Sequence, residues 1–365
     1  MTDKDIKIHH MLAPFSFLYE LGVRLRNQLF DWGLLSSEQY PVPVICIGNL
    51  SVGGTGKTPH TEYIINLLKN QYRIAVLSRG YKRRTSGFIL ADENSTSRDI
   101  GDEPYQMKNK FSDILVAVDA NRRRGIQQLL ALPTEKRPEV ILLDDAFQHR
   151  YVSPSLSLVL TDYHRLFYYD KLLPAGRLRE PLCGIRRADI VIVTKCEEDL
   201  KPIEFRIMEE NMKLKAHQLL FFTRIKYGLP QPVFPEIADL PTLNEINQEN
   251  SILAISGIAS PTLFIEQVKT ISQKSEFAVF PDHHIFSKSD FKKLDTQYGK
   301  LETPGTFILV TEKDAARLKD NPLVPERWKK VLYYLPITID FCLDRNFDET
   351  IKKHIITVQK NSILR

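Results

Sequence analysis

The feature that most constrains the fold is a glycine-rich loop that joins an apolar run to an amphipathic segment. The run Val42–Ile47 is typical of a buried strand, and Thr58–Lys69 carries apolar residues at helical spacing. Between them stands Gly48-Asn-Leu-Ser-Val-Gly-Gly-Thr-Gly-Lys-Thr58. A loop of this kind, between a strand and a helix, directs backbone N–H groups toward phosphate oxygens. The sequence therefore predicts a P-loop that binds a nucleotide.

The loop also contains the side chains that such a site needs. Lys57 is expected to reach the β and γ phosphates of ATP, and Thr58 to offer its hydroxyl to Mg²⁺. The commoner motif has glycine where this chain has Ser51, so the match is to its second half, and an ordinary glycine turn is the alternative. The predicted ATP-binding residues are Ser51, Val52, Gly53, Gly54, Thr55, Gly56, Lys57 and Thr58.

Short apolar runs recur along the chain between helical segments, an alternation that favours a parallel α/β sheet. They lie at residues 73–77, 114–118, 140–143, 157–160 and 190–193. A second set at 252–255, 276–280 and 307–310 predicts a smaller α/β domain, flanked by the β-prone segments 220–227 and 331–341. We expect a P-loop domain over residues 1–220, a second domain with β linkers over 221–341, and a C-terminal helix at 342–365 that returns to the first domain.

Three acidic segments are candidates for the chemistry. Asp144 and Asp145 follow a buried run and are placed to hold Mg²⁺, the alternative being that they cap a helix. Asp102, in Gly101-Asp-Glu-Pro104, is a candidate to accept the proton of a hydroxyl group, although turns of this composition are common on surfaces. In Asp282-His-His284 we expect one functional histidine rather than a metal pair, since successive side chains of a strand face opposite ways.

Composition narrows the classes of function. A net charge of +5 over 365 residues is too small for a dedicated nucleic-acid binder, and the four cysteines form no C-x-x-C pair. No apolar run is long enough to span a bilayer. An amphipathic helix is predicted at about residues 12–35, with Phe15, Leu18 and Trp32 on its apolar face. It either packs on the core or lies in a membrane interface.

Taken together, the motifs resemble those of the tetraacyldisaccharide 4′-kinases, the lipid A 4′-kinases of Gram-negative bacteria. The resemblance covers nearly the whole chain, and its blocks follow the family's order: the P-loop, Ser78-Arg-Gly-Tyr81, Gly101-Asp-Glu-Pro104, Leu143-Asp-Asp-Ala-Phe-Gln-His149, Leu173-Pro-Ala-Gly-Arg-Leu-Arg-Glu-Pro181, Asp282-His283 and Thr311-Glu-Lys-Asp314.

The resemblance implies transfer of the γ-phosphate of ATP to the 4′-hydroxyl of a tetraacylated glucosamine disaccharide 1-phosphate, giving lipid IVA. It implies a peripheral enzyme on the cytoplasmic face of the inner membrane, with a lipid substrate, no nucleic acid and no obligate protein partner. By similarity, Asp102 is the catalytic base and His283 tunes it as a dyad. The implied ligands of Mg²⁺ are Thr58, Asp144, Asp145 and Glu180, and the implied substrate contacts are Tyr81, Arg122, Gln148, His149 and Arg179.

Two other classes of protein remain as alternatives. A P-loop ATPase or GTPase switch of the partitioning or metal-insertion type would hydrolyse nucleotide without an acceptor, but such switches usually have a lysine where this chain has Val52. A membrane-surface adaptor with a vestigial P-loop would bind lipid whatever the nucleotide. The retained Lys57, Thr58, Asp144 and Asp145 argue against it.

Overall fold

The computed structural model describes residues 8–238, 250–301, 305–343 and 345–363. The chain divides into two compact units: unit 1 comprises Met1–Ile225 and Ile339–Arg365, and unit 2 comprises Lys226–Thr338. The chain leaves unit 1 within strand β8 (Leu219–Tyr227) and returns to it within β14 (Ile337–Phe341). The outer limits of the predicted domains, residues 1 and 365, lie outside the described residues.

Among the described residues of unit 1, nine strands form one sheet in the order β14-β8-β7-β6-β1-β5-β2-β4-β3. The pairs from β8 to β4 are parallel, and β3 is antiparallel to β4. The chain moves outward from β1 to β4 and then returns to pair β5 and β6 on either side of β1, so ligands are expected at the carboxyl ends of these central strands. The strands are β1 (Val44–Asn49), β2 (Ile74–Ser78), β3 (Ile89–Leu90), β4 (Leu115–Val118), β5 (Val140–Asp144), β6 (Leu156–Asp162) and β7 (Ile190–Thr194).

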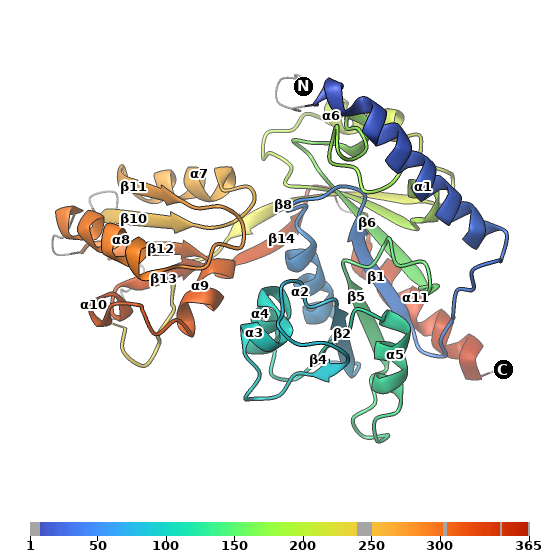
Figure 1. The fold of residues 1–365 in the computed structure, drawn as a ribbon, viewed down its shortest axis with the longest axis horizontal. Coiled ribbons are helices and arrows are strands. Elements are labelled where there is room, and N and C mark those ends of the chain that lie inside the picture. The colour runs from blue at the N-terminus through green and yellow to red at the C-terminus, as the bar shows by residue number, and fades with distance from the viewer. Residues whose placement is uncertain (1–7, 239–249, 302–304, 344, 364–365) are drawn as a thin grey trace. The chain divides into compact units, whose positions relative to one another are not determined.

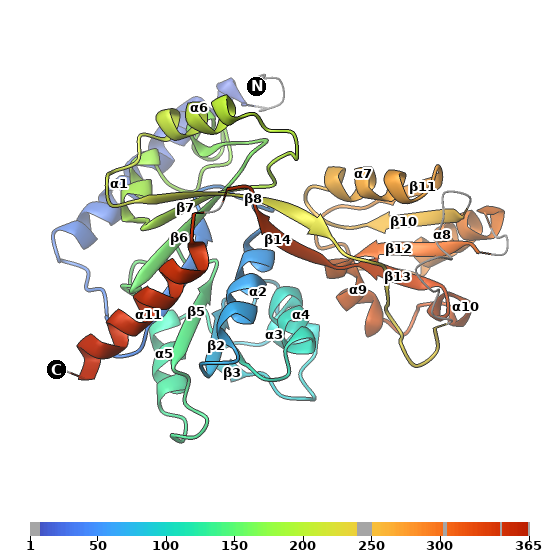
Figure 2. The same ribbon diagram turned by 180° about the vertical axis from the view of Figure 1, so that it is seen from behind.

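Helices cover both faces of this sheet because its central strands are apolar on both sides. Alternate residues of β1 illustrate this: Ile45 and Ile47 are fully buried against α2 (Lys57–Leu68), α4 (Asp102–Lys110) and α11 (Phe347–Ile363). Figure 2 looks onto this face, with α11 in front of the strands. Val44 and Cys46 face the second core, to which α5 (Arg122–Leu130) and α6 (Pro202–Met212) contribute.

Further elements surround this core. Helix α1 (Ala13–Asp31) runs along the outside of unit 1, in front of the sheet in Figure 1. The remaining short helices of the described part of unit 1 are η1 (His10–Leu12), α3 (Ser97–Ile100), η2 (Phe167–Tyr169) and η3 (Leu182–Arg187).

Unit 2 contains a five-stranded sheet in the order β11-β10-β12-β13-β9, with β9 antiparallel to β13 and the other pairs parallel. Helix α7 packs on one face, and α8, α9 and α10 pack on the other around the buried Trp328. The strands are β9 (Gln231–Pro232), β10 (Ser251–Ser256), β11 (Lys274–Val279), β12 (Phe307–Thr311) and β13 (Leu332–Leu335). The helices are α7 (Thr262–Ile271), α8 (Lys288–Leu301), α9 (Glu312–Lys319) and α10 (Glu326–Lys329).

The predicted fold class, a parallel α/β sheet flanked by helices with a second smaller α/β unit, is confirmed. One detail differs from the sequence interpretation, and one alternative left open there is excluded. The β-prone segment 331–341 forms two strands, β13 and β14, because Pro336 stands between them and cannot donate to a ladder. Asp144 and Asp145 cap no helix, since β5 is followed by turns up to β6.

Candidate active site

The glycine-rich loop of unit 1 has the conformation that its glycines allow. Gly53 has φ of 112° and Gly56, which precedes the first residue of α2, has φ of 83°. Residues with a side chain rarely adopt this left-handed region. Within the loop, Asn49 Nδ2 donates to Thr55 Oγ1 at 2.9 Å. The loop therefore ends directly on the N-terminus of α2, where backbone N–H groups and the helix dipole favour an anion.

Two acidic residues lie beside the loop because β5 pairs with β1. The register places Asp144, the last residue of β5, next to Ile47, two residues before β1 ends at Asn49. Lys57 Nζ lies 3.6 Å from Asp145 Oδ1, and Arg179 Nη1 donates to the same oxygen at 2.8 Å. Burial raises the pKa of Asp145, but Lys57 and Arg179 together outweigh it and hold the pKa below its usual value. Asp145 is therefore an ionised carboxylate between two cations.

Asp144 differs from its neighbour because it is fully buried. Ser78 Oγ lies 3.5 Å from Oδ2, while Oδ1 has no hydrogen-bond partner among the described residues. Burial, with smaller contributions from Glu103 and Asp145, raises its pKa to about 7. A buried carboxylate oxygen without a partner is an oxygen ligand of the kind that Mg²⁺ prefers.

The segment that contains Arg179 and Glu180 runs alongside the phosphate loop. Val52 N donates to Arg177 O at 2.8 Å, and Arg179 N donates to Leu50 O at 2.7 Å. Glu180 is buried beside this contact. The loop and the Leu173-Pro-Ala-Gly-Arg-Leu-Arg-Glu-Pro181 motif are therefore one structural unit.

Gln148 connects these parts. Its Nε2 donates to Asn49 O at 2.8 Å and to Glu180 Oε1 at 2.9 Å, and its Oε1 lies 3.4 Å from Arg179 Nη1. The other oxygen of Glu180 accepts from Arg187, whose guanidinium also lies over the ring of Phe147. Glu180 is thus paired, in contrast to Asp144.

Arg122 and His149 are two further residues near Asp144: Arg122 contacts its backbone, and the charge of Arg122 acts on His149. Arg122 is buried at the start of α5, donating to Asp119 O at 2.7 Å and to Asp144 O at 3.3 Å, and its Nε has no partner among the described residues. Burial and the neighbouring Arg122, Arg26 and Arg123 lower the pKa of His149 to about 4. A neutral imidazole beside several arginines is suited to an anionic ligand.

Asp102 and Tyr81 lie together in unit 1. Asp102 is the first residue of α4, and the preceding Gly101 has φ of 92°. A side chain at Gly101 would come within 3.0 Å of Tyr81 O. The backbone next to Asp102 is therefore in close contact with the backbone of Tyr81. Tyr81 is 60% exposed. The charge of Glu103 raises the pKa of Asp144. The start of α4 therefore lies near the two aspartates at the end of β5.

His283 belongs to unit 2, at the carboxyl edge of that sheet, in the left-handed conformation with φ of 59°. Arg317 Nη2 lies 3.2 Å from its Nδ1, and Lys313 Nζ lies 3.5 Å from its Nε2. Because a guanidinium only donates, the closer contact makes Nδ1 an acceptor, and a proton on Nε2 would face Asp282 Oδ2, 3.7 Å away. His284 is engaged elsewhere, 3.0 Å from Asp290 Oδ2 and stacked on Phe280.

Arg317 is itself held in place. Its Nη1 donates to Asp314 Oδ1 at 2.8 Å and to Gly257 O at 2.9 Å. The buried Asp314 also accepts from Gly257 N at 2.8 Å and from Thr311 Oγ1 at 2.6 Å. The Thr311-Glu-Lys-Asp314 motif therefore supports the arginine that orients His283.

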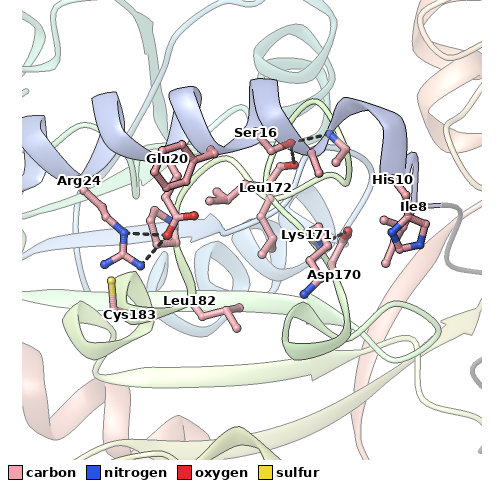
Figure 3. Close-up of a pocket in the computed structure, with 15 residues that line it drawn as sticks. Ile8, His10, Ser16, Glu20, Arg24, Asp170, Lys171, Leu172, Leu182 and Cys183 are labelled. Carbon is pink, nitrogen blue, oxygen red and sulfur yellow. Dashed lines mark hydrogen bonds and ion pairs between the residues drawn. The ribbon is translucent and has the colours of Figure 1, made fainter.

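A pocket of about 480 Å³ lies between α1 and the segment 170–183 (Figure 3). Ser16, Glu20 and Arg24 of α1 line it together with Leu172 and Leu182, and Ser16 Oγ donates to Leu172 O at 3.0 Å. Apolar side chains of α1 are exposed: Phe15, Phe17, Leu18, Leu21 and Leu25 are each more than half exposed, and Phe17 also lines the pocket. Within the described residues, none of the helices is both long and apolar enough to cross a membrane.

Sequence reasoning missed several residues of this site. Asn49, Arg187 and the Lys195–Asp162 pair all contact the loop or its neighbours. Lys195 follows the buried strand β7 directly, and a lysine at the carboxyl end of a parallel strand is the signal that would have drawn attention to it. Among the described residues, no three His, Cys, Asp or Glu side chains gather as a metal site. Mg²⁺ in kinases is held by one or two carboxylates together with substrate phosphates.

Comparison with known proteins places this geometry in a family. The family model for tetraacyldisaccharide-1-P 4′-kinase matches residues 8–356. A tetraacyldisaccharide 4′-kinase of Parabacteroides distasonis is 59% identical over 99% of this chain and 98% of its own length. That of Bacteroides thetaiotaomicron is 51% identical over 98% of this chain and 94% of its own.

A solved structure agrees with these relatives. The crystal structure of the "apo" form of LpxK from Aquifex aeolicus in complex with ATP is 31% identical, with a TM-score of 0.73, and the match covers 96% of this chain and 98% of that one. On the family match over nearly the full length, this chain belongs to the tetraacyldisaccharide-1-P 4′-kinase family.

Proposed function

We propose that this protein transfers the γ-phosphoryl group of ATP to the 4′-hydroxyl of tetraacyldisaccharide 1-phosphate, the lipid A precursor, to form lipid IVA. The observation that carries this is the 59% identity to a tetraacyldisaccharide 4′-kinase over 99% of the chain, together with a P-loop whose Lys57 lies 3.6 Å from Asp145. ATP is the donor, as in the complex of the Aquifex aeolicus relative. A switch that only hydrolyses nucleotide is not favoured.

The donor is proposed to bind along residues 51–58. Backbone amides at the start of α2 meet the phosphates, and Lys57 neutralises charge on the β and γ phosphates. Transfer forms a bond between the γ-phosphorus and the 4′-oxygen and breaks the bond to the oxygen that leaves with ADP. Little else is required of the protein, because phosphoryl transfer depends mainly on positioning and on charge stabilisation.

Mg²⁺ is proposed to be held by Thr58, Asp144 and Asp145, with Glu180 nearby. The fit is best at Asp144, whose buried Oδ1 has no partner in the described part of the chain. Glu180 already accepts from Gln148 and Arg187 and is suited to orienting them. The bound ion supplies neutralisation of phosphate charge. Burial raises the pKa of Asp144 to about 7 in the ion-free protein, so binding of Mg²⁺ below that pH would release a proton from this carboxyl.

Asp102 is proposed to accept the proton of the 4′-hydroxyl as the transfer proceeds. It stands at the first residue of α4, whose second residue, Glu103, acts on Asp144. His283 is proposed to assist this proton transfer. Arg317 is proposed to hold its ring with the proton on Nε2. The proposed contacts of the lipid substrate are Tyr81, Arg122, Gln148, His149 and Arg179.

We also propose that α1 holds the protein on the membrane that contains its substrate, on the cytoplasmic face. The support is the exposed apolar surface of α1, together with the neighbouring pocket and its Arg24. Replacing Leu18 and Leu25 with serine should lower the fraction bound to anionic vesicles several-fold in a sedimentation assay. Unchanged binding would exclude this role for the helix.

The reaction is tested by transfer of labelled γ-phosphate from ATP to tetraacyldisaccharide 1-phosphate in detergent micelles. Native protein should yield labelled lipid. Asp102→Asn should lower kcat by about 10² to 10³, as expected for loss of a general base. Glu103→Gln, one residue away, is the matched control and should lose less than tenfold. ATP hydrolysis without labelled lipid would reject the kinase, and an Asp102→Asn variant of native activity would reject the base.

A further inference from the structure

Three consecutive carbonyl groups of the phosphate loop, those of Gly54–Gly56, are each held by a side chain outside the loop. The first oxygen accepts from Lys195 Nζ at 2.5 Å, and the second from Thr194 Oγ1 at 2.9 Å. The third lies 2.7 Å from Nδ1 of His60. Thr194 is the last residue of β7 and Lys195 follows it, about 140 residues along the chain from the loop.

Lys195 is an unusual lysine. Its side chain is only 8% exposed, and besides the loop carbonyl it contacts Asp162 Oδ2 at 2.6 Å. Its backbone has φ of 58°, a conformation that persists for a residue with a side chain only where the surroundings enforce it. The Lys195 ammonium thus donates to a backbone oxygen and to a carboxylate, and these contacts offset the cost of burying its charge. The exposed Lys82 and Lys213 share this left-handed backbone, so burial is the property that sets Lys195 apart from them.

His60 completes the arrangement in its neutral form. Its ring is buried, and both ring nitrogens lie within hydrogen-bond distance of protein oxygens. Since the Gly56 oxygen can only accept, Nδ1 carries the proton, and Nε2 accepts from Thr223 Oγ1 at 3.0 Å. The third carbonyl is therefore tied to α2 and, through Thr223, to β8.

The consequence follows from peptide geometry. In a trans peptide the carbonyl and the next N–H point to opposite sides. Holding the oxygens of Thr55 and Gly56 toward β7 and α2 turns the N–H groups of Gly56 and Lys57 the other way. Thr55 N donates within the loop to Gly53 O at 3.1 Å. Gly54 O, which Lys195 holds, belongs to the same peptide as Thr55 N, so Lys195 fixes the inner turn of the loop. Thr194 and His60 fix the direction in which the amides of Gly56 and Lys57 face.

We propose that Lys195, together with Thr194, positions the phosphate loop of this kinase, so that its amides are oriented before nucleotide binds. The inference rests on the proposed function, because it assumes that residues 51–58 hold the phosphates of ATP. Lys195 is a positioning residue and makes no contact with the reacting atoms. Binding of the phosphate groups, rather than of the lipid, is the property that depends on it.

The test compares Lys195→Met, Thr194→Val and Thr194→Ser with native protein, using fluorescence titration with a methylanthraniloyl derivative of ATP and steady-state kinetics. Lys195→Met should weaken nucleotide binding at least tenfold and raise KM for ATP similarly, with KM for the lipid within twofold of native. Thr194→Val should weaken binding about three- to tenfold. Thr194→Ser, which keeps the hydroxyl, should restore it.

Controls separate this inference from the proposed function. Lys136→Met, at an exposed lysine of unit 1, should bind nucleotide as native protein does. If native protein binds the ATP derivative and both Lys195→Met and Thr194→Val bind it within twofold, the inference is overturned while the kinase stands. If Lys195→Met does not fold by circular dichroism, the Thr194 pair decides. Native protein that binds no nucleotide would overturn the proposed function, and this inference with it.

Discussion

The carboxyl edges of the two sheets each have a fully buried aspartate, Asp144 in unit 1 and Asp314 in unit 2, but their surroundings differ. Asp144 has an oxygen with no partner in the described structure and a pKa raised to about 7. Asp314 accepts from Gly257 N, Thr311 Oγ1 and Arg317. A buried carboxylate that lacks partners costs stability, so its presence indicates a ligand that is charged. A buried carboxylate with a full set of hydrogen-bond partners indicates a structural role.

This difference in hydrogen bonding indicates that the two carboxyl edges have different functions. In unit 1, Lys57, Arg179 and Arg122 surround two carboxylates and form a site for phosphate and a cation. In unit 2 the charges of Asp314 and Arg317 neutralise each other and fix one face of His283. We therefore expect substitutions in unit 1 to act mainly on ligand binding and transfer, and those in unit 2 to act mainly on orientation and folding.

The largest contrast is expected between two lysines with the same geometry. Lys57 lies 3.6 Å from Asp145, and Lys313 lies 3.6 Å from Asp282. Lys57→Ala should lower kcat/KM for ATP by about 10³, because it removes a cation from the transferring phosphoryl group. Lys313→Ala should lower it by less than tenfold. The assay is transfer of labelled phosphate. Equal losses of kcat/KM in the two variants would contradict the proposed difference between the two sheet edges.

How far the sequence predicts this site depends on the range of the contacts. The P-loop, its Lys57 and the aspartates after β5 are local patterns of strand, loop and helix, and the sequence contains them. The anchor of Thr55 on Thr194 joins residues 139 apart and depends on the β6–β7 register as well as on the strand order. The spacing of apolar residues along the sequence does not show which strands pair or in which register. Arg317 is likewise three residues beyond Asp314 on α9, and only the fold shows that it meets His283.

A smaller effect is expected at Arg317. Arg317→Met removes the donor to Nδ1 of His283, so the ring is free to take either tautomer. We expect kcat to fall about tenfold with little change in KM for ATP. The ¹⁵N chemical shifts of the two ring nitrogens should show a proton on Nε2 in native protein and a mixture in the variant.

Two outcomes would contradict this orienting role. Lys292→Met, at an exposed lysine of α8, is the control and should match native protein in both measurements. A native ring protonated on Nδ1 would show that Arg317 does not set the tautomer. A fall in activity with an unchanged tautomer would show that Arg317 acts in another way.

The last prediction concerns stability and has opposite signs in the two units. The pKa of Asp144 is about 7 in the folded protein and about 4 for an exposed aspartate, so the folded state binds the extra proton between these values. The unliganded fold therefore loses stability as pH rises from about 4 to 7, and the loss is complete above 7. Asp144→Asn removes the ionisable group, so it should raise Tm by a few degrees at pH 8, while abolishing most activity.

Asp314→Asn should instead lower Tm, because it breaks a buried pair and leaves Arg317 without its carboxylate, at a cost of about 3–5 kcal/mol. Thermal unfolding without nucleotide at pH 8 and pH 5 separates the two cases. The advantage of Asp144→Asn should shrink at pH 5, because Asp144 of the native protein is then protonated when folded and the pH lies close to its unfolded pKa. If Asp144→Asn also lowered Tm at pH 8, Asp144 would be a supporting carboxylate like Asp314, and the assignment of a cation to it would fail.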